Sequence, residues 1–263
     1  MRVTVEGFGS DILPNDETNL VAQSALRLFA ATGNPPPAGL RIHCVNDFPT
    51  SSGMGSSSAA IVMGLVGANQ LLEQPFSTDD MLALANEIEG HPDNVAPALL
   101  GGLTMATRHE GRVIARCVDV PPLRMIIAVP IFALSTKQSR AALPEMVLHT
   151  DAVFNVGRVP LVVEALRTGD LSLLASALDD RLHQPYRLKL MPFCAEAIRA
   201  AKSAGAPAAA LSGAGPGVVA FLDADTPAER VLHAMTDAFS AHGLKRWGQE
   251  CKPSLVGAEV LSS

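Results

Sequence analysis

The chain has 263 residues, of which 48% are hydrophobic and 17% charged. This length allows one large domain or two ordinary ones, and the composition excludes intrinsic disorder, because disordered chains are poor in apolar residues and rich in charge. The formal net charge of −6, without an extended run of Lys or Arg, argues against a nucleic-acid partner held through its phosphates.

Neither a membrane span nor a secretory signal is predicted. The longest apolar runs, residues 59–68 and 125–134, have ten residues each, about half of what a bilayer-spanning helix needs. The first residues, Met-Arg-Val-Thr-Val-Glu, lack the long apolar stretch of a secretory signal. The four cysteines, at positions 44, 117, 194 and 251, include no Cys-x-x-Cys pair, so we expect a cytoplasmic protein with reduced thiols.

The first 45 residues predict a strand, a helix and a second strand. Residues 2–6 predict a strand that begins at the initiator methionine. Residues 19–31 repeat apolar side chains about every 3.6 residues, which indicates an amphipathic helix ended by the Gly-Asn-Pro-Pro-Pro run from Gly33. Residues 40–45 alternate apolar and polar side chains, a pattern typical of a half-buried strand.

A helix is predicted after the loop at residues 46–55. It ends at Leu72, and either Ser56 or Ser57 is expected to cap its start. Two glycines, Gly64 and Gly67, lie inside it. Each costs a helix about 1 kcal/mol relative to Ala, so we expect both to allow close packing of another element.

The remaining elements are helices and strands in mixed order. A helix begins at Ser77 with a capping-box-like Ser-Thr-Asp-Asp and ends at Gly90. Strands are predicted near residues 103–107, 112–118 and 124–129. Beyond residue 151 the chain is mainly helical, with helices near 156–168, 171–182, 192–203 and 227–241 and strands near 208 and 218. Pro121-Pro122 is the best candidate boundary between two α+β domains meeting across a cleft.

The segment at residues 49–60, Pro-Thr-Ser-Ser-Gly-Met-Gly-Ser-Ser-Ser-Ala-Ala, lies between a predicted strand and a predicted helix. Glycines let backbone N–H groups turn inward, serines add hydroxyl donors, and the helix start adds partial positive charge, so the segment suits a phosphate. It is not a Walker A loop, because no Lys follows the second Gly. The alternative is a flexible Ser/Gly connection.

A second informative segment runs from Glu87 to Pro97. Glu89 ends a predicted helix, where the macrodipole disfavours an anion, and no Lys or Arg in the last turn compensates it. A cation is therefore expected from elsewhere, and carboxylate oxygens are ligands that Mg²⁺ takes. The alternatives are a solvated surface Glu89, and turn or capping roles for His91 and Asp93.

Three segments in order along the chain resemble the GHMP small-molecule kinases. Residues 49–60 are similar to the phosphate-binding motif of this superfamily. Glu-Gly-His-Pro-Asp-Asn-Val-Ala-Pro-Ala-Leu-Leu-Gly-Gly at 89–102 is more specific and resembles its homoserine kinase branch. Leu-Ser-Gly-Ala-Gly-Pro-Gly at 211–217 resembles the third, Gly-rich motif, with Gly217 where Ser or Thr is more usual.

The resemblance implies the GHMP kinase fold, an α+β fold of two domains with the active site in the cleft between them. Residues 1–121 would form the N-terminal, ATP-binding domain, which is like domain 2 of ribosomal protein S5. Residues 122–263 would form a ferredoxin-like C-terminal domain. A homodimer is also what the resemblance suggests.

The resemblance further implies ATP, Mg²⁺ and L-homoserine as the bound molecules. Ser57 and Glu89 would hold Mg²⁺, and His91 and Asn94 would lie at the substrate and its reacting hydroxyl. The ATP phosphates would bind at a loop centred on Gly53 to Ser58, comprising Pro49, Thr50, Ser51, Ser52, Gly53, Met54, Gly55, Ser56, Ser57, Ser58 and Ala59.

Two later segments match the family's substrate-facing positions. Ser-Thr-Lys-Gln-Ser-Arg at 135–140 resembles its Ser-Thr-Lys-x-x-Arg segment, which would bring Thr136 and Arg140 to the substrate. Pro-Tyr-Arg at 185–187 would bring Arg187 to the substrate carboxylate, a role suited to the planar guanidinium fork. Without the resemblance, Thr136 and Arg140 are ordinary helix-start residues and Arg187 a surface ion-pair partner.

The implied reaction transfers the γ-phosphoryl group of ATP to the side-chain hydroxyl of L-homoserine, on the way to threonine. Positioning and charge neutralisation dominate such a step, with Asn94, Glu89 and Arg140 as the catalytic residues, and no strong base is assigned. Alternatives are a GHMP kinase acting on another small alcohol and a non-catalytic binding protein of the same fold. Glu89 and Asn94 argue against a binding protein, and Arg140 with Arg187 favours a substrate that carries a carboxylate.

The resemblance does not include the family's beginning. The family opens with a motif like Ser-Ala-Asn-Leu-Gly-Pro-Gly-Phe-Asp, and this chain has neither its Asn nor its Asp at a matching place. Residues 3–21 resemble the family's next segment, directly after that motif. Either the translation start was placed too far downstream, which we favour, or this is a shortened form with altered activity. The chain as given is then expected to bind homoserine poorly and to expose an unpaired strand edge.

Overall fold

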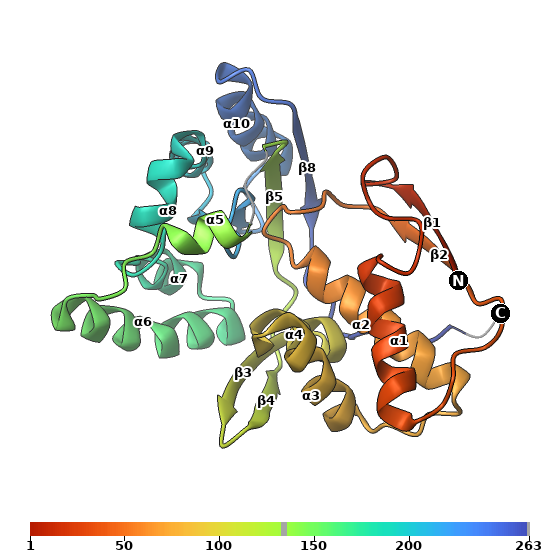
Figure 1. Cartoon of the computed structure of the whole chain (residues 1–263). Helices are drawn as coiled ribbons and strands as arrows, with labels where there is room; N and C mark the ends of the chain where they lie inside the picture. Colours follow the sequence, from red (N-terminus) through yellow and green to blue (C-terminus); the bar gives the residue numbers. More distant parts are fainter. Residues whose placement is uncertain (133–135, 262–263) are drawn as a thin grey trace. The chain divides into compact units, whose positions relative to one another are not determined.

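The structure is a computed structural model that describes residues 1–132 and 136–261, with the side chains at 136, 137 and 140 left out of the description (Figure 1). The chain divides into two compact units. The first contains Met1–Thr50, Gly55–Val118 and Ser254–Ser263, and the second contains Ser51–Met54 and Asp119–Pro253. Helices and strands occur in both, so the predicted α+β class is confirmed. The domain boundary at residue 121 stays a prediction.

The first unit contains four helices and four strands among the described residues. They are β1 Arg2–Gly7, α1 Leu20–Thr32, β2 Arg41–Asn46, α2 Ser56–Leu71, α3 Thr78–Glu89, α4 Pro92–Leu100, β3 Leu103–His109 and β4 Arg112–Val118. β1 and β2 pair in parallel around the crossover helix α1, and β3 and β4 form an antiparallel hairpin. The helices bury one hydrophobic core, with Phe29, Ile61 and Leu65 among its fully buried side chains.

The two glycines of α2 behave differently. A Cβ atom on Gly64 would overlap the carbonyl oxygen of Val21 on α1, so the close approach of the two helices requires a glycine there. A Cβ on Gly67 would meet nothing within 4 Å. The prediction of close packing is confirmed for Gly64 and wrong for Gly67, because Gly67 faces solvent on the exposed side of the helix.

Side-chain caps explain where two of these four helices, α1 and α3, begin. Asn19 caps α1 by accepting a hydrogen bond from the N–H of Val21. Ser77 and Asp80 form the predicted capping box at the start of α3. The prediction of a serine cap for α2 is wrong: Gly55 is the N-cap and no side chain caps this helix. The glycine is needed because the chain enters α2 with a left-handed φ of 75°.

The second unit contains a four-stranded antiparallel sheet in the order β6-β7-β5-β8. Its elements are β5 Arg124–Pro130, α5 Thr136–Ala141, α6 His149–Thr168, α7 Leu171–Ala177, α8 Gln184–Leu190, α9 Pro192–Ser203, β6 Ala208–Leu211, β7 Val218–Leu222, α10 Ala228–Ala241 and β8 Arg246–Cys251. The path β5-α9-β6-β7-α10-β8 is the expected ferredoxin-like order. Helices α5 to α8 are inserted between β5 and α9.

Helices cover both faces of this sheet. Alternate strand residues such as Ala209, Ala220 and Ile126 pack with α9 and α10 in one core. Their neighbours Ala208 and Phe221 belong to a separate cluster with residues of α6 and α7. Because successive side chains of a strand point to opposite faces, the two clusters lie on opposite sides of the sheet.

Several elements differ from the sequence prediction. The helix expected over 171–182 is wrong in its second half, since α7 ends at Ala177 and a new helix starts at Gln184. The carboxylate of Asp180 accepts the main-chain N–H groups of the three residues at 182–184, which starts the new helix. α4 and β8 were not predicted. No described helix is long and apolar enough to cross a membrane.

Candidate active site

The phosphate-loop segment at 49–59 has the backbone of a tight Gly-rich turn. Ser51, Gly53 and Gly55 have φ angles of 53°, 78° and 75°, the left-handed region that favours glycine. Pro49 and Thr50 belong to the first unit, 51–54 to the second, and α2 begins in the first unit at Ser56. Ser56, Ser57, Ser58 and Ala59 form the first turn of α2; the N–H of Ala59 donates to the Gly55 carbonyl oxygen, whereas the three serine N–H groups precede the first i to i−4 hydrogen bond of the helix.

In the second unit the middle of this loop packs on the Gly-rich turn at 211–217. The N–H of Gly217 donates to the carbonyl oxygen of Ser52 at 2.9 Å, and the Ser212 hydroxyl donates to that of Gly53 at 2.9 Å. A Cβ on Gly217 would overlap the Ser52 carbonyl oxygen. This explains a glycine where Ser or Thr is more usual, and it brings two of the predicted segments together.

Arg187 and the short helix α5 lie against the same turn. The buried Ser139 hydroxyl donates to the carbonyl oxygen of Ala214 at 2.8 Å. The Arg187 guanidinium donates from Nε to the Ser139 carbonyl oxygen at 3.5 Å and from Nη1 to that of Gly213 at 3.4 Å. Thr136 and Arg140 belong to the backbone of α5, but their side chains lie outside the described residues.

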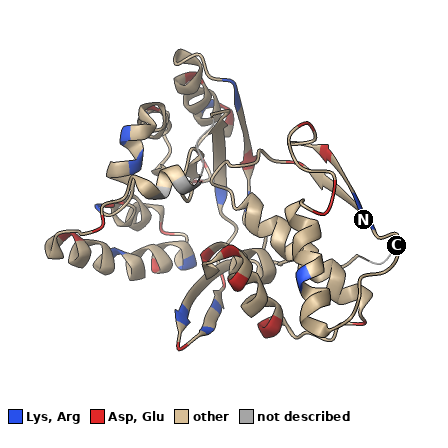
Figure 2. Ribbon diagram, viewed as in Figure 1, with Lys and Arg blue, Asp and Glu red and all other residues tan. Residues whose placement is uncertain are grey.

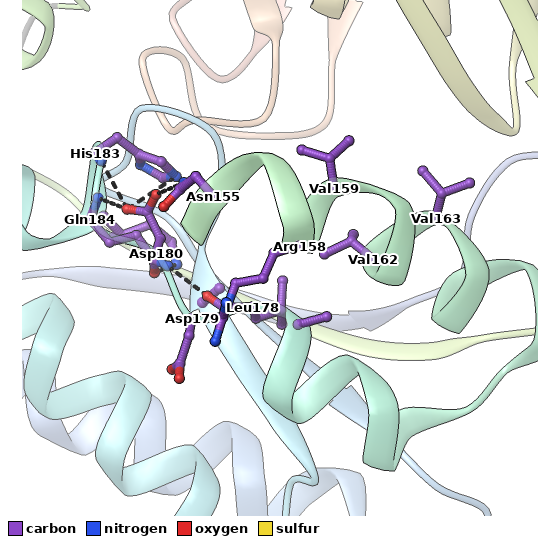
Figure 3. Close-up of a pocket in the computed structure, with 13 residues that line it drawn as sticks. Asn155, Arg158, Val159, Val162, Val163, Leu178, Asp179, Asp180, His183 and Gln184 are labelled. Atoms are coloured by element: carbon purple, nitrogen blue, oxygen red, sulfur yellow. Dashed lines mark hydrogen bonds and ion pairs between the residues drawn. The ribbon is translucent and has the colours of Figure 1, made fainter. Parts of the chain in front are cut away.

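A polar network that the sequence did not predict holds the start of α8 (Figure 3). Asp180 accepts a 2.6 Å hydrogen bond from the Asn155 side chain of α6 as well as three main-chain N–H groups. His183 Nδ1 then lies 3.2 Å from Nη1 of Arg187, and because Arg187 can only donate, the imidazole accepts. Asn155 and Asp180 are 25 residues apart, so helical or strand periodicity could not have revealed the contact.

The pKa values of two network residues fit this arrangement. Burial raises the pKa of Asp180, but the hydrogen bonds from Asn155 and the main chain lower it more, so the net pKa lies below its ordinary value. Burial lowers the pKa of His183, and the positive charge of Arg187 adds to this, while Asp180 opposes it. A neutral His183 beside a cationic Arg187 is the state that the geometry favours.

In the first unit, Glu89 lies at the N-terminus of α2. Its Oε1 accepts hydrogen bonds from the hydroxyls of Ser57 at 2.7 Å and Ser58 at 3.1 Å, and its side chain is 11% exposed. No basic residue lies in the last turn of α3, which Glu89 ends. The unfavourable dipole of α3 is therefore offset by the positive end of α2 and by two hydroxyl donors.

The segment after Glu89 turns back beside it. His91 is the N-cap of α4, followed by Pro92 at the first helical position, and its Nε2 lies 3.9 Å from Glu89 Oε1. His91 Nδ1 lies 2.7 Å from Asp93 Oδ1 without the angle of a hydrogen bond. Asn94 is exposed, and a Cβ on Gly55 would be 4.0 Å from the Asn94 Cβ. Asn94 thus lies next to the glycine that begins α2.

The oxygen atoms around Glu89 fit a hard divalent cation. A carboxylate and two hydroxyls are the donor types that Mg²⁺ takes, and this ion usually keeps several waters or phosphate oxygens besides one or two protein ligands. Helices α3 and α4 carry acidic residues and no Lys or Arg (Figure 2). The described part of the chain holds no group of three or more His, Cys, Asp or Glu side chains able to bind a metal alone.

Comparisons with known proteins identify the family of this chain. The family model described as "GHMP kinases N terminal domain" matches residues 19–102, and the model described as "GHMP kinases C terminal" matches residues 162–241. A homoserine kinase of Moorella thermoacetica is 43% identical over 99% of this chain and 87% of its own length. The chain belongs to the GHMP kinase family.

Other GHMP kinases extend the comparison. A homoserine kinase of Desulfitobacterium hafniense is 46% identical over 99% of this chain and 87% of its own length. The crystal structure of a homoserine kinase from Cytophaga hutchinsonii matches with a TM-score of 0.86 and 31% identity, covering 97% of this chain and 83% of that one. The expected GHMP kinase fold is thereby confirmed.

Proposed function

We propose that the protein transfers the γ-phosphoryl group of ATP to the side-chain hydroxyl of L-homoserine, giving O-phospho-L-homoserine. Relatives named homoserine kinase, 43% and 46% identical over nearly the whole chain, support this substrate. The observation that carries the proposal is the 2.7 Å contact between Glu89 and Ser57, at the helix that comes after the Gly-Met-Gly loop. It combines a carboxylate with a phosphate-binding helix start, the two features that phosphoryl transfer from a metal nucleotide needs.

The loop from 49 to 59 is proposed to bind the ATP phosphates through its main-chain N–H groups and serine hydroxyls. Ser57 and Glu89 would hold Mg²⁺, whose charge, when it is bound, neutralises the negative charge that develops on the phosphoryl oxygens. The Ser52–Gly217 and Gly53–Ser212 hydrogen bonds fix the loop before nucleotide binds. Preformed donors of this kind lose little free energy to rearrangement during the reaction.

Substrate recognition is proposed for five other side chains. Arg187 would bind the homoserine carboxylate with its planar fork, held in place by His183 and by the carbonyl oxygens of Gly213 and Ser139. Asn94 and His91 would position the amino acid and its reacting hydroxyl, and Arg140 with Thr136 would assist by the family resemblance. No residue is assigned as a strong general base, because the step depends on alignment and charge neutralisation.

A substrate panel tests the proposal. ADP release would be measured with ATP and Mg²⁺ for L-homoserine, D-homoserine, the decarboxylated analogue 3-aminopropan-1-ol, galactose and mevalonate, with ³¹P NMR to identify the product. We expect turnover of L-homoserine with clear preference over 3-aminopropan-1-ol, which lacks the carboxylate. Turnover of a sugar or mevalonate in its place would assign another GHMP activity. ATP binding without turnover of any alcohol would favour the non-catalytic alternative.

Two broader proposals accompany this function. The four cysteines at 44, 117, 194 and 251 are free thiols, which supports a cytoplasmic location. A homodimer is proposed from the family resemblance alone, and sedimentation equilibrium of the purified protein would test it.

A further inference from the structure

The second unit contains a cavity of about 280 Å³ beside α6 and the segment that joins α7 to α8 (Figure 3). Its aliphatic lining includes Val159, Val162 and Val163 from α6 together with Leu178. The volume equals that of roughly nine liquid waters and lies just below the range of about 300–1,000 Å³ typical of drug-sized ligands. A ligand of about the size of an aliphatic amino acid would fit.

Arg158 lines this cavity with a positive charge that no described anion balances. Its Nε is buried without a hydrogen-bond acceptor, and its Nη1 donates to the carbonyl oxygen of Phe154 at 3.3 Å. The centre of the guanidinium lies 3.2 Å from the centroid of the Phe154 ring. Among the residues that the structure describes, Arg158 has no ion pair. A half-buried guanidinium with an unpaired donor lowers the stability of the folded protein unless an anion pairs with it.

Two other polar side chains of the cavity already have hydrogen-bond partners, whereas a third does not. Asp180 accepts four hydrogen bonds, and the Gln184 side chain donates to the Leu178 carbonyl oxygen and accepts from the N–H of Leu211. Asp179 is also among the residues that line the cavity, and its exposed side chain makes no hydrogen bond or ion pair within the described chain. The cavity thus offers one unused cation and one unused anion beside an aliphatic wall.

We propose that this cavity binds a small aliphatic α-amino acid as its zwitterion. The ligand carboxylate would pair with Arg158, its ammonium group with Asp179, and its hydrocarbon side chain would contact the valines of α6. The charge of each ligand group is opposite to that of its partner, and the apolar wall would bury the remainder. His183 and Gln184 also line the cavity, so an occupant would touch the start of the helix that carries Arg187.

Calorimetric titration of the full chain with L-leucine, isovalerate and isoamylamine tests the assignment. The three probes share an isobutyl group: L-leucine carries both charges, isovalerate only the carboxylate and isoamylamine only the ammonium group. We expect saturable binding of L-leucine, weaker binding of isovalerate and the weakest binding of isoamylamine. Arg158→Gln should weaken L-leucine binding by about tenfold or more. Arg167→Gln, on the same helix but paired with Glu164 at 2.8 Å, is the matched control and should leave it unchanged.

A second pair of variants separates this site from the proposed substrate site. L-leucine should still bind to the Arg187→Gln variant. If Arg187→Gln abolished L-leucine binding and Arg158→Gln left it unchanged, the amino acid would bind at the substrate site and the proposal would be overturned. Absence of binding up to about 10 mM would also overturn it. Circular dichroism would reveal whether Arg158→Gln fails to fold, and in that case Asp179→Asn is the test. This variant should weaken the binding of L-leucine and leave the binding of isovalerate unchanged. Equal effects on the binding of both ligands would refute the zwitterion site.

Discussion

At the scale of single residues, Glu89 has the most informative surroundings. It ends one helix and lies at the beginning of another, so that two hydroxyls and a helix N-terminus stabilise a carboxylate that its own helix disfavours. The local sequence predicted an unbalanced carboxylate at this point. Helical periodicity and capping rules could not predict that Ser57 and Ser58 donate hydrogen bonds to Glu89, because that contact depends on how α2 and α3 pack; only the family resemblance paired Ser57 with Glu89.

Replacement of Glu89 by Gln tests the proposed metal site. The amide keeps an acceptor for both serine hydroxyls, so the thermal midpoint should change little, while the lost charge should lower kcat by about 100-fold or more. The measurement is ADP release over a range of Mg²⁺ concentrations. Glu87→Gln is the control, since Glu87 lies on the same helix but is exposed and pairs with Arg27 at 3.4 Å. Equal activities of the two variants would contradict a metal role for Glu89.

At the scale of elements, the sequence predicted those whose pattern is local. The amphipathic α1, the capping box of α3 and the strands β1 to β4 all agree with periodicity and caps. It missed α4, where His-Pro-Asp-Asn is typical of a turn and Pro97 interrupts the helical pattern. It missed β8 because Arg-Trp-Gly-Gln-Glu-Cys lacks clear alternation, and its strand conformation depends on pairing with β5. Contacts with other parts of the fold determine the conformation of α4 and β8.

The packing of α1 on α2 predicts opposite changes in stability when each of the two glycines of α2 is replaced by alanine. Gly64→Ala should destabilise the first unit by about 1–3 kcal/mol, because the new Cβ overlaps the main chain of α1. Gly67→Ala should stabilise it by about 1 kcal/mol, since the site is open and alanine favours a helix. Scanning calorimetry of both variants would measure the shifts in midpoint. A stabilising Gly64→Ala would refute the proposed reason for that glycine.

The start of α8 gives a prediction for substrate binding. Asp180→Asn removes the charge that orders the N–H groups at the start of this helix, and with it the support of His183 for Arg187. We expect the KM for homoserine to rise by about tenfold, with smaller changes in kcat and in the KM for ATP. Asp225→Asn, at an exposed Asp of the second unit outside this network, is the control and should leave all three unchanged. A fall in kcat alone would argue against a positioning role.

The stabilising contribution of Asp180 should depend on pH in a defined direction. Its pKa is lower in the folded protein than in the unfolded chain, so the folded state binds fewer protons on this group. Its contribution is therefore complete above about pH 4, the ordinary pKa of Asp, and is lost as the pH falls through the folded-state value. The difference in thermal midpoint between wild type and Asp180→Asn should shrink when the pH is lowered from about 7 towards about 3. A constant difference would contradict this assignment.

At the scale of the whole molecule, the chain has separate hydrophobic cores. One cluster lies entirely within the first unit, and the two others lie within the second. Each unit also contains two free cysteines, Cys44 and Cys117 in the first and Cys194 and Cys251 in the second. Cores of this kind allow each unit to unfold with its own midpoint, and the thiols can report which one has opened.

Thiol labelling in increasing urea should therefore resolve two transitions. Cys117 is exposed and should react in the native protein, whereas Cys194 is fully buried, and burial raises its pKa to about 12. Since the thiolate is the reactive form, Cys194 should react only after the second unit unfolds, and Cys44 should report the first. Mass spectrometry of labelled peptides gives both curves from one titration. Different midpoints for Cys44 and Cys194 are expected, because each hydrophobic core lies within one unit, and coincident midpoints would show that the chain unfolds as one cooperative block.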